Sequence, residues 1–406
     1  MASQSHSQVL VEETSSVRIL TLNRPKQLNA LSLNMITRLL QLFLAYEEDP
    51  SVKLIILKGQ GRAFCAGGDV PAVVRDIRLG KWRQSADFMS LEYTLNYVIA
   101  TYSKPQVSIL DGIVMGGGAG VCVHGRFRIA TENTVFAMPE TALGFFPDVG
   151  ASYFLSRLPG FFGEYVGLTG ARLDGAEMLA CGLATHFVPS TRLAALEADL
   201  CGVGSSDPVT FASTILDTYT QHPNPKHQSA FHRLDVIDRC FSRRTVEEII
   251  SALEIEATHK ADDWISAAIG ALEKASPASL KISLRSVRFQ DASQACNDGK
   301  DKLTVNCVYK FQIREGRLQG VGECLIRENR MVSHVMKGAI SKDLVEGCRA
   351  ILIDKDRSPK WEPRRLEEMK DSMVEQYFKR VEEEDGWEDL KLPPRKHLPA
   401  SVIAKL

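Results

Sequence analysis

The sequence predicts an α/β protein, with a core over residues 1–200 and a long helical region over residues 201–406. Strand-like and helix-like patterns alternate over roughly the first 190 residues, and this alternation is typical of α/β proteins. From about residue 200 the strand patterns become rare and charged amphipathic helices replace them. A chain of 406 residues, 44% of them hydrophobic, can bury a large core without disulfides or metals.

The elements of the first region follow from the spacing of its apolar residues. Residues 17–22 alternate as a strand, which ends at Asn23-Arg24-Pro25. Ser32 is a good N-cap for a helix that ends at Asp49-Pro50. The later elements are expected to be strands at 53–57, 106–110, 127–130 and 134–137, a long helix at 82–103, and a helix opened by the glycines at 116–118.

The second region is expected to be helical. Leu366, Met369, Met373 and Tyr377 would share one face of an amphipathic helix. Residues 221–226 hold two prolines among polar residues and are the best candidate for a flexible connection.

Composition excludes several classes of function. Lys and Arg together number 49 against 50 Asp and Glu, so no overall field favours nucleic acid or a membrane surface. The nine cysteines are scattered without a CxxC pair, which favours free thiols over a zinc site. The longest apolar stretches fall short of the roughly 18 to 20 residues that span a bilayer. Residues 1–13 show neither a signal peptide nor a mitochondrial presequence.

Two glycine-rich loops each follow a predicted strand and precede a predicted helix, at residues 61–69 and 111–118. Glycine lets a backbone approach a ligand closely, and the peptide N–H groups at a helix start are free to bind an oxygen. The loops could therefore form an oxyanion hole or could simply be tight turns. The segment 116–120 lacks the final glycine of a dinucleotide-binding fingerprint, and the sequence holds no phosphate-loop, nucleophile-elbow or zinc-peptidase motif.

These loops resemble a known family. Phe64-Cys-Ala-Gly-Gly-Asp69 and Asp111-Gly-Ile-Val-Met-Gly-Gly-Gly118 resemble the two oxyanion-hole motifs of the crotonase (enoyl-CoA hydratase/isomerase) superfamily, and residues 23–30 resemble its N-terminal signature. The resemblance implies a core that is a spiral of ββα turns. It also implies an oxyanion hole formed by the backbone N–H groups of Gly68 and Gly117. The resemblance further implies that three residues lie along the path of coenzyme A, namely Lys26, Ala66 and Asp69.

The carboxylates decide which branch of the superfamily is most similar. Gly120 stands where hydratases carry one glutamate, and Glu140 matches their second, so the resemblance argues against hydration. Residues 138–150, which include Asp148, resemble the 3-hydroxyisobutyryl-CoA hydrolase branch of valine catabolism. That similarity continues at residues 276–281, 346–356 and 360–363. It implies hydrolysis of the thioesters of 3-hydroxyisobutyryl-CoA and 3-hydroxypropionyl-CoA.

Hydrolysis needs a group that attacks or activates water, and stabilisation of the tetrahedral oxyanion. Glu140 and Asp148 could supply the first, and their mutual repulsion would raise the pKa of one of them. The alternatives are a solvated loop acid for Glu140 and a helix N-cap for Asp148.

Two further polar residues fall in apolar surroundings. Glu92 shares a helical stripe with apolar neighbours, and the resemblance matches it to a glutamate that touches the polar end of the acyl group. The alternative for Glu92 is a residue at the edge of the stripe that reaches solvent. His124 is expected to be a hydrogen-bonded structural residue, since the loop acids already explain the chemistry.

Other functions within the superfamily stay open. One alternative is a dienoyl-CoA or enoyl-CoA isomerase, and another is a non-catalytic relative that binds coenzyme A or RNA. Gly120 and the long match in the second region argue against the isomerase. Glu140, Asp148 and the near-zero net charge argue against the non-catalytic relative. We expect no metal and no cofactor other than the coenzyme A of the substrate. Superfamily members often form trimers or hexamers, so a homo-oligomer is an option, but the extra helices could cover the same surface.

The last three residues, Ala404, Lys405 and Leu406, resemble the C-terminal tripeptide that the peroxisomal import receptor reads. A proline-containing tail precedes them, and no presequence is visible at the other end. The sequence therefore predicts peroxisomal import, with that receptor as a partner.

Overall fold

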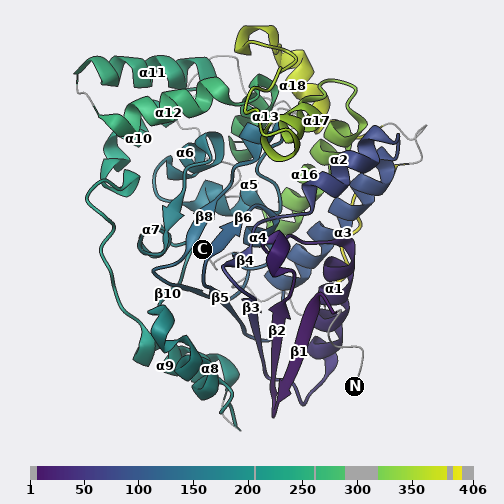
Figure 1. Ribbon diagram of the computed structural model, residues 1–406, viewed down its shortest axis with the longest axis vertical. Coiled ribbons are helices and arrows are strands. Elements are labelled where there is room, and N and C mark those ends of the chain that lie inside the picture. Colours follow the sequence, from purple (N-terminus) through teal and green to yellow (C-terminus); the bar gives the residue numbers. More distant parts are fainter. Residues whose placement is uncertain (1–6, 205–206, 260–261, 289–318, 382–386, 396–406) are drawn as a thin grey trace, which may run out of the picture.

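The computed structural model describes residues 7–204, 207–259, 262–288, 319–381 and 387–395, and Figure 1 shows their arrangement. Ten strands form two sheets. The six-stranded sheet has the order β1-β2-β3-β5-β7-β10, and the four-stranded sheet has the order β4-β6-β8-β9. The strands are β1 (Val9–Thr14), β2 (Val17–Leu22), β3 (Leu54–Gly59), β4 (Ala63–Cys65), β5 (Gln106–Leu110), β6 (Ile113–Met115), β7 (Phe127–Ala130), β8 (Val135–Ala137), β9 (Leu173–Asp174) and β10 (His186–Phe187).

From β3 to β8, consecutive strands alternate between the two sheets. β3, β5 and β7 pair in parallel in the larger sheet, whereas β4, β6 and β8, which follow them, pair in parallel in the smaller one. Each of the pairs β3/β4, β5/β6 and β7/β8 thus adds one strand to each sheet. After the first two of these pairs, helices return the chain to the larger sheet. This arrangement confirms the predicted ββα spiral. Antiparallel pairs occur at β1–β2 and β8–β9.

The helices of the core begin and end close to their predicted bounds. α1 (Leu33–Glu48) has Ser32 as its N-cap, and the Ser32 hydroxyl accepts a hydrogen bond from Met35 N at 3.2 Å. The predicted helix at 82–103 is α3 (Trp82–Ala100). The remaining helices of this region are α2 (Val70–Arg78), α4 (Gly117–Gly120), α5 (Ala151–Phe154), α6 (Phe162–Thr169), α7 (Gly175–Ala180) and α8 (Leu193–Leu200).

The six-stranded sheet is apolar on both faces. Ile55 and Leu57 of β3 join the main hydrophobic core, whereas Leu54 and Ile56 join a second cluster on the opposite face. α8 and α9 (Pro208–Tyr219) cover that second face, at the lower left of Figure 1. β3 therefore reads as a continuous apolar run, as expected for a strand covered on both sides.

The helices beyond α9 share the main core. They are α10 (Leu234–Phe241), α11 (Val246–His259), α12 (Asp263–Lys274), α13 (Pro277–Arg288), α16 (Val321–Lys337), α17 (Asp343–Cys348) and α18 (Asp371–Phe378). α16 packs against α3, α17 against α2 and α13 against α6. One hydrophobic cluster therefore includes both Val9 and Phe378. The division at residue 200 stays a prediction, since α9 covers the same sheet as α8.

One helix expected in this region is interrupted. The segment 366–377 forms a 3₁₀ turn (Leu366–Glu368) and then α18, with Lys370 in an extended conformation between them. The Met369 carbonyl accepts a hydrogen bond from Lys281 Nζ of α13 at 3.0 Å, so a tertiary contact takes up a backbone group beside the break. The expected connection at 221–226 has no regular secondary structure. Within the described ranges, no helix is long and apolar enough to cross a bilayer.

Candidate active site

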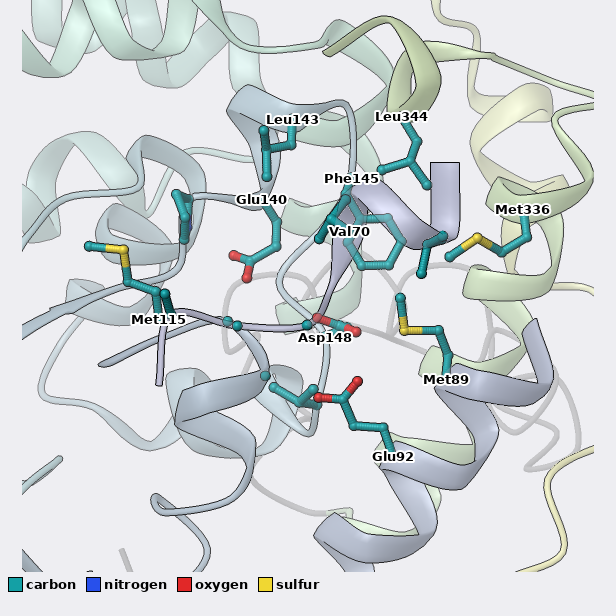
Figure 2. Close-up of a pocket in the computed structure, with 18 residues that line it drawn as sticks. Val70, Met89, Glu92, Met115, Glu140, Leu143, Phe145, Asp148, Met336 and Leu344 are labelled. Atoms are coloured by element: carbon teal, nitrogen blue, oxygen red, sulfur yellow. The ribbon is translucent and has the colours of Figure 1, made fainter. Parts of the chain in front are cut away.

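A cavity lies between the two glycine-rich loops, α3 and the chain that follows β8, and helices from the second region close one side of it (Figure 2). Its polar groups are the Glu92, Glu140 and Asp148 carboxylates and the backbone of both loops. The rest of the lining is largely apolar and comprises Ala66, Val70, Val73, Met89, Met115, Pro139, Leu143, Phe145, Val149, Met336 and Leu344.

Gly68 and Gly117 lie together at this cavity, as the oxyanion-hole prediction requires. The Gly68 nitrogen is 3.2 Å from the point where a Cβ atom on Gly117 would lie. The bridge to Leu31 uses Gly67 O and Asp69 N, so it leaves the Gly68 N–H unused. Gly117 opens α4, where the first N–H has no partner within the helix. The two N–H groups therefore lie close together at the cavity, and their role as an oxyanion hole stays a prediction.

A side chain at position 117 would meet the Glu92 carboxylate. A Cβ atom there would come within 2.3 Å of Glu92 Oε1. The same distance shows that the Glu92 carboxylate lies beside the two converging N–H groups.

The three carboxylates reach the cavity from different elements, and Figure 2 shows them pointing toward it. Glu92 comes from α3, Glu140 opens a 3₁₀ turn (Glu140–Leu143) after β8, and Asp148 lies in the turn before α5. Their exposed fractions are only 1%, 6% and 5% respectively. The solvated alternatives for Glu92 and Glu140 are therefore wrong. Glu92 Oε1 and Glu140 Oε2 have no hydrogen-bond partner among the described residues, as expected of groups that face a ligand.

The Asp148 carboxylate also does not cap a helix. Gly150 occupies the N-cap position of α5, and Tyr93 donates its hydroxyl hydrogen to Asp148 Oδ2 at 2.7 Å. Tyr93 follows Glu92 on α3 and is fully buried. The α3 helix thus contributes both a carboxylate and the group that holds a second carboxylate.

Burial perturbs all three carboxyl groups. Desolvation, reinforced by the charge of Asp148, raises the pKa of Glu92 to about 8 and raises the pKa of Glu140 well above its ordinary value. Desolvation raises the pKa of Asp148 to about 7, although the Tyr93 hydrogen bond opposes this shift. Burial thus brings the pKa values of Glu92 and Asp148 toward neutral pH, the range in which acid–base catalysis is most effective.

The structure explains why position 120 holds glycine rather than the glutamate of a hydratase. A Cβ atom at this position would come within 2.7 Å of Val149 Cβ and 2.9 Å of Asn96 Nδ2. The space into which a hydratase glutamate would project is filled by these side chains. The geometry therefore agrees with the sequence argument against hydration.

The residues expected along the coenzyme path are less closely grouped. Ala66 lines the cavity, whereas Lys26 is exposed on a 3₁₀ turn (Pro25–Gln27). Asp69 accepts a hydrogen bond from Arg24 Nη2 at 2.9 Å and lines a neighbouring groove with Phe88. Roles of Lys26, Ala66 and Asp69 in coenzyme binding stay predictions.

Several residues at the site were not identified from the sequence. Tyr93 gave no signal beyond its place next to Glu92, and Met336 and Leu344 are distant in the chain. Glu328 of α16 binds the turn that carries Asp148 through Gly150 and Ser152. Its position on the apolar face of α16, one turn from Leu325 and Val332, is the signal that could have identified it.

The comparisons with known proteins agree with this geometry. The model of the enoyl-CoA hydratase/isomerase family matches residues 17–308 and 301–378. The chain belongs to this family. Among its relatives is the 3-hydroxyisobutyryl-CoA hydrolase 1 of Arabidopsis thaliana, which is 78% identical over 100% of this chain and 99% of the relative.

The family also includes proteins with other names. The small ribosomal subunit protein mS47 of Arabidopsis thaliana is 40% identical over 97% of this chain and 90% of its own length. A solved structure, of a carnitinyl-CoA dehydratase from Mycobacterium thermoresistibile, is 34% identical, with a TM-score of 0.80 over 96% of this chain and 100% of that protein. The family and fold are therefore secure over nearly the whole chain, including the second region.

Proposed function

We propose that this chain hydrolyses the thioester of 3-hydroxyisobutyryl-CoA, a step of valine catabolism, to the free acid and coenzyme A, and that it also accepts 3-hydroxypropionyl-CoA. The observation that carries the proposal is the set of three buried carboxylates around the converging N–H groups of Gly68 and Gly117. The 78% identity to a protein of that name supports the choice of substrate.

Catalysis follows from the arrangement of these groups. The thioester oxygen accepts hydrogen bonds from Gly68 N–H and Gly117 N–H, which stabilise the negative charge of the tetrahedral intermediate. Glu140, as a general base, takes a proton from water while the oxygen of that water bonds to the acyl carbon. When the carbon–sulfur bond breaks, the coenzyme A thiolate leaves and takes up the proton from Glu140. Burial, reinforced by the charge of Asp148, raises the pKa of Glu140 and so makes it a stronger base. These groups supply both parts of the chemistry, so we propose no cofactor beyond the substrate's coenzyme A.

A second route uses Glu140 as the nucleophile. Its carboxylate would bond to the acyl carbon, release the thiolate, and give an anhydride that water then opens. A single turnover in ¹⁸O water separates the routes. General-base catalysis places the label in the first product molecule, whereas opening of the anhydride at the glutamyl carbon places it in the protein.

Glu92 accounts for the expected preference for a 3-hydroxyl group. Its Oε1 atom is buried beside Gly117 and has no hydrogen-bond partner in the part of the chain that the structure describes. A hydroxyl on the acyl chain would satisfy that atom, and a substrate without one would leave it unpaired. An unpaired buried polar atom costs about 1–3 kcal/mol, which is about a 5- to 150-fold difference in specificity.

The test compares release of free coenzyme A from 3-hydroxyisobutyryl-CoA and from isobutyryl-CoA. We expect kcat/KM to be higher for the hydroxylated substrate, and Glu140→Gln to lower kcat by at least about 100-fold with little change in KM. Equal turnover of both thioesters, or an active Glu140→Gln variant, contradicts the proposal. Retention of RNA without turnover would instead favour the non-catalytic alternative, and migration of a double bond in an enoyl-CoA would favour the isomerase.

We also propose that the chain is imported into peroxisomes through Ala404, Lys405 and Leu406, which lie outside the described residues. A fluorescent protein placed ahead of residues 397–406 should collect in peroxisomes. Deletion of the tripeptide, or residues added after Leu406, should leave it in the cytosol because the receptor reads a free C-terminus. A mitochondrial signal from the full-length protein would contradict this localisation.

A further inference from the structure

The turn that carries Asp148 has an unfavourable backbone conformation. Val149 has φ = 55°, a region that β-branched residues rarely occupy, and Gly150 follows with φ = 84°. A strained residue of this kind costs on the order of 1–3 kcal/mol and persists only where surrounding contacts hold it. The strained position directly follows the Asp148 carboxylate, so the contacts that maintain it also determine where that carboxylate lies.

Glu328 of α16 provides the first of these contacts. Its Oε2 atom accepts a hydrogen bond from Gly150 N at 2.7 Å, and its Oε1 atom accepts two from Ser152, from N at 3.0 Å and from Oγ at 2.6 Å. Glu328 is fully buried. A buried carboxylate is costly unless it is hydrogen-bonded, and here both oxygens are used on one short turn.

His124 provides the second contact, from the opposite side of the turn. Its Nε2 atom lies 2.7 Å from the carbonyl oxygen of Val149. A carbonyl can only accept, so the imidazole donates and carries its proton on Nε2. The Val149 carbonyl and the Gly150 N–H belong to the same peptide unit. Glu328 and His124 therefore bind the two polar ends of the one peptide that follows the strained residue.

Four groups from three elements bear on the charge of Asp148. Tyr93 of α3 donates a hydrogen bond to it, and Glu328 of α16 acts through its negative charge. Glu92 of α3 and Glu140 of the 3₁₀ turn after β8 are coupled to Asp148 by charge repulsion. Loss of the Glu328 charge would thus lower the pKa of Asp148, because that charge raises it.

We propose that Glu328 and His124 are positioning residues, which hold the Val149–Gly150 peptide and thereby fix the Asp148 carboxylate in the catalytic cavity. The inference rests on the proposed thioester hydrolysis for its kinetic consequence but not for its geometry. It also gives the second region a part in catalysis, since α16 supplies Glu328.

Glu328→Gln tests the proposal. Glutamine keeps one acceptor oxygen but presents an N–H₂ group to Gly150 N–H or to Ser152, so one side of the turn loses its acceptor. We expect kcat to fall by about 10- to 100-fold with KM within about threefold. The apparent pKa of the activity limb that reports Asp148 should move to lower pH. Asn329→Ala is the matched control, because Asn329 is also buried on α16 but binds Ser90 of α3.

A direct titration separates this inference from the proposed function. The carboxyl carbon of Asp148, assigned by comparison with Asp148→Asn, can be followed by NMR without substrate. A changed carboxyl-carbon chemical shift of fully ionised Asp148 in Glu328→Gln, beside the lower pKa that loss of the Glu328 charge gives, supports the inference even if the chain hydrolyses no thioester. An unaltered kcat and an unaltered Asp148 titration overturn it. An equal loss of activity in Glu328→Gln and Asn329→Ala, with no change in the titration, also overturns it and indicates a merely structural role.

Variants of His124 provide a second test. His124→Phe keeps a ring of similar size but removes the donor to Val149, whereas His124→Gln keeps an N–H donor. We expect about a tenfold loss of kcat in His124→Phe and a partial recovery in His124→Gln. Thermal unfolding confirms that each variant is folded before its kinetics are compared. Equal kcat values for the two variants would overturn the role of this hydrogen bond.

Discussion

Glu92→Gln should stabilise the protein, and the gain should grow with pH. The ordinary pKa of this side chain is 4.5, and burial raises it to about 8. The folded protein therefore binds a proton that the unfolded chain releases between these two values, so the free energy of unfolding falls as pH rises through that window. Glutamine has the same shape and no charge to desolvate, and it removes this loss.

The size of the effect follows from the two pKa values. At about 1.4 kcal/mol per pH unit, the raised pKa of Glu92 lowers the free energy of unfolding by about 2 kcal/mol at pH 6 and about 5 kcal/mol at pH 9. The free energy of unfolding gained by Glu92→Gln should thus be about 3 kcal/mol larger at pH 9 than at pH 6. Local rearrangement that admits water would reduce this figure.

Urea or thermal unfolding of both proteins at the two pH values measures the difference. Asp87→Asn is the matched control, because Asp87 is an exposed acid on the same helix and should give no such trend. The same stability difference at pH 6 and pH 9 would refute the reasoning, since it would mean that Glu92 is not a desolvated carboxyl group.

Three further predictions follow from the cavity. Tyr93→Phe should raise the apparent pKa that Asp148 gives to a pH–rate profile, because the Tyr93 hydrogen bond lowers that pKa. Tyr102→Phe is the control and should leave this pKa unchanged, since it loses only a hydrogen bond to Phe43 O outside the cavity. The Gly120→Glu variant should have a lower melting temperature and should not hydrate crotonyl-CoA. The Gly270→Glu control should unfold near the original temperature, because a Cβ atom at that position meets nothing within 4 Å. Measurable hydration by the Gly120→Glu variant would contradict the prediction. Leu344→Ala should raise the kcat/KM ratio of a longer to a shorter 3-hydroxyacyl-CoA by about tenfold, and an unchanged ratio would show that Leu344 does not limit the acyl group.

Much of the fold could be predicted because its signals are local. The cap at Ser32, the apolar run of β3 and the glycines before α4 depend on neighbouring residues, and each agreed with the structure to within a few positions. The family resemblance added the spiral order of the strands, which periodicity alone did not give. The predicted helix over 366–377 is confirmed only from Asp371, and the break before it lies where the Met369 carbonyl accepts a hydrogen bond from Lys281, a contact that is not visible in local spacing.

The sequence by itself determined which chemical groups are present at the site, because Gly68, Gly117, Glu140 and Asp148 lie in short motifs with fixed local geometry. It also excluded a hydratase glutamate at position 120, and the structure adds that Val149 leaves no room for one. These conclusions needed no knowledge of distant contacts.

Only the tertiary structure decided how those groups behave. Glu92 could have faced solvent or the acyl group, and it is buried because α3 packs against α16. The turn at Asp148 is held by Glu328, which is 178 positions from Gly150, and its carboxyl group is bound by Tyr93, which is 55 positions away. The pKa of a carboxyl group depends on the water that surrounding segments exclude and on the charges they bring near, and spacing along the chain carries little information about either.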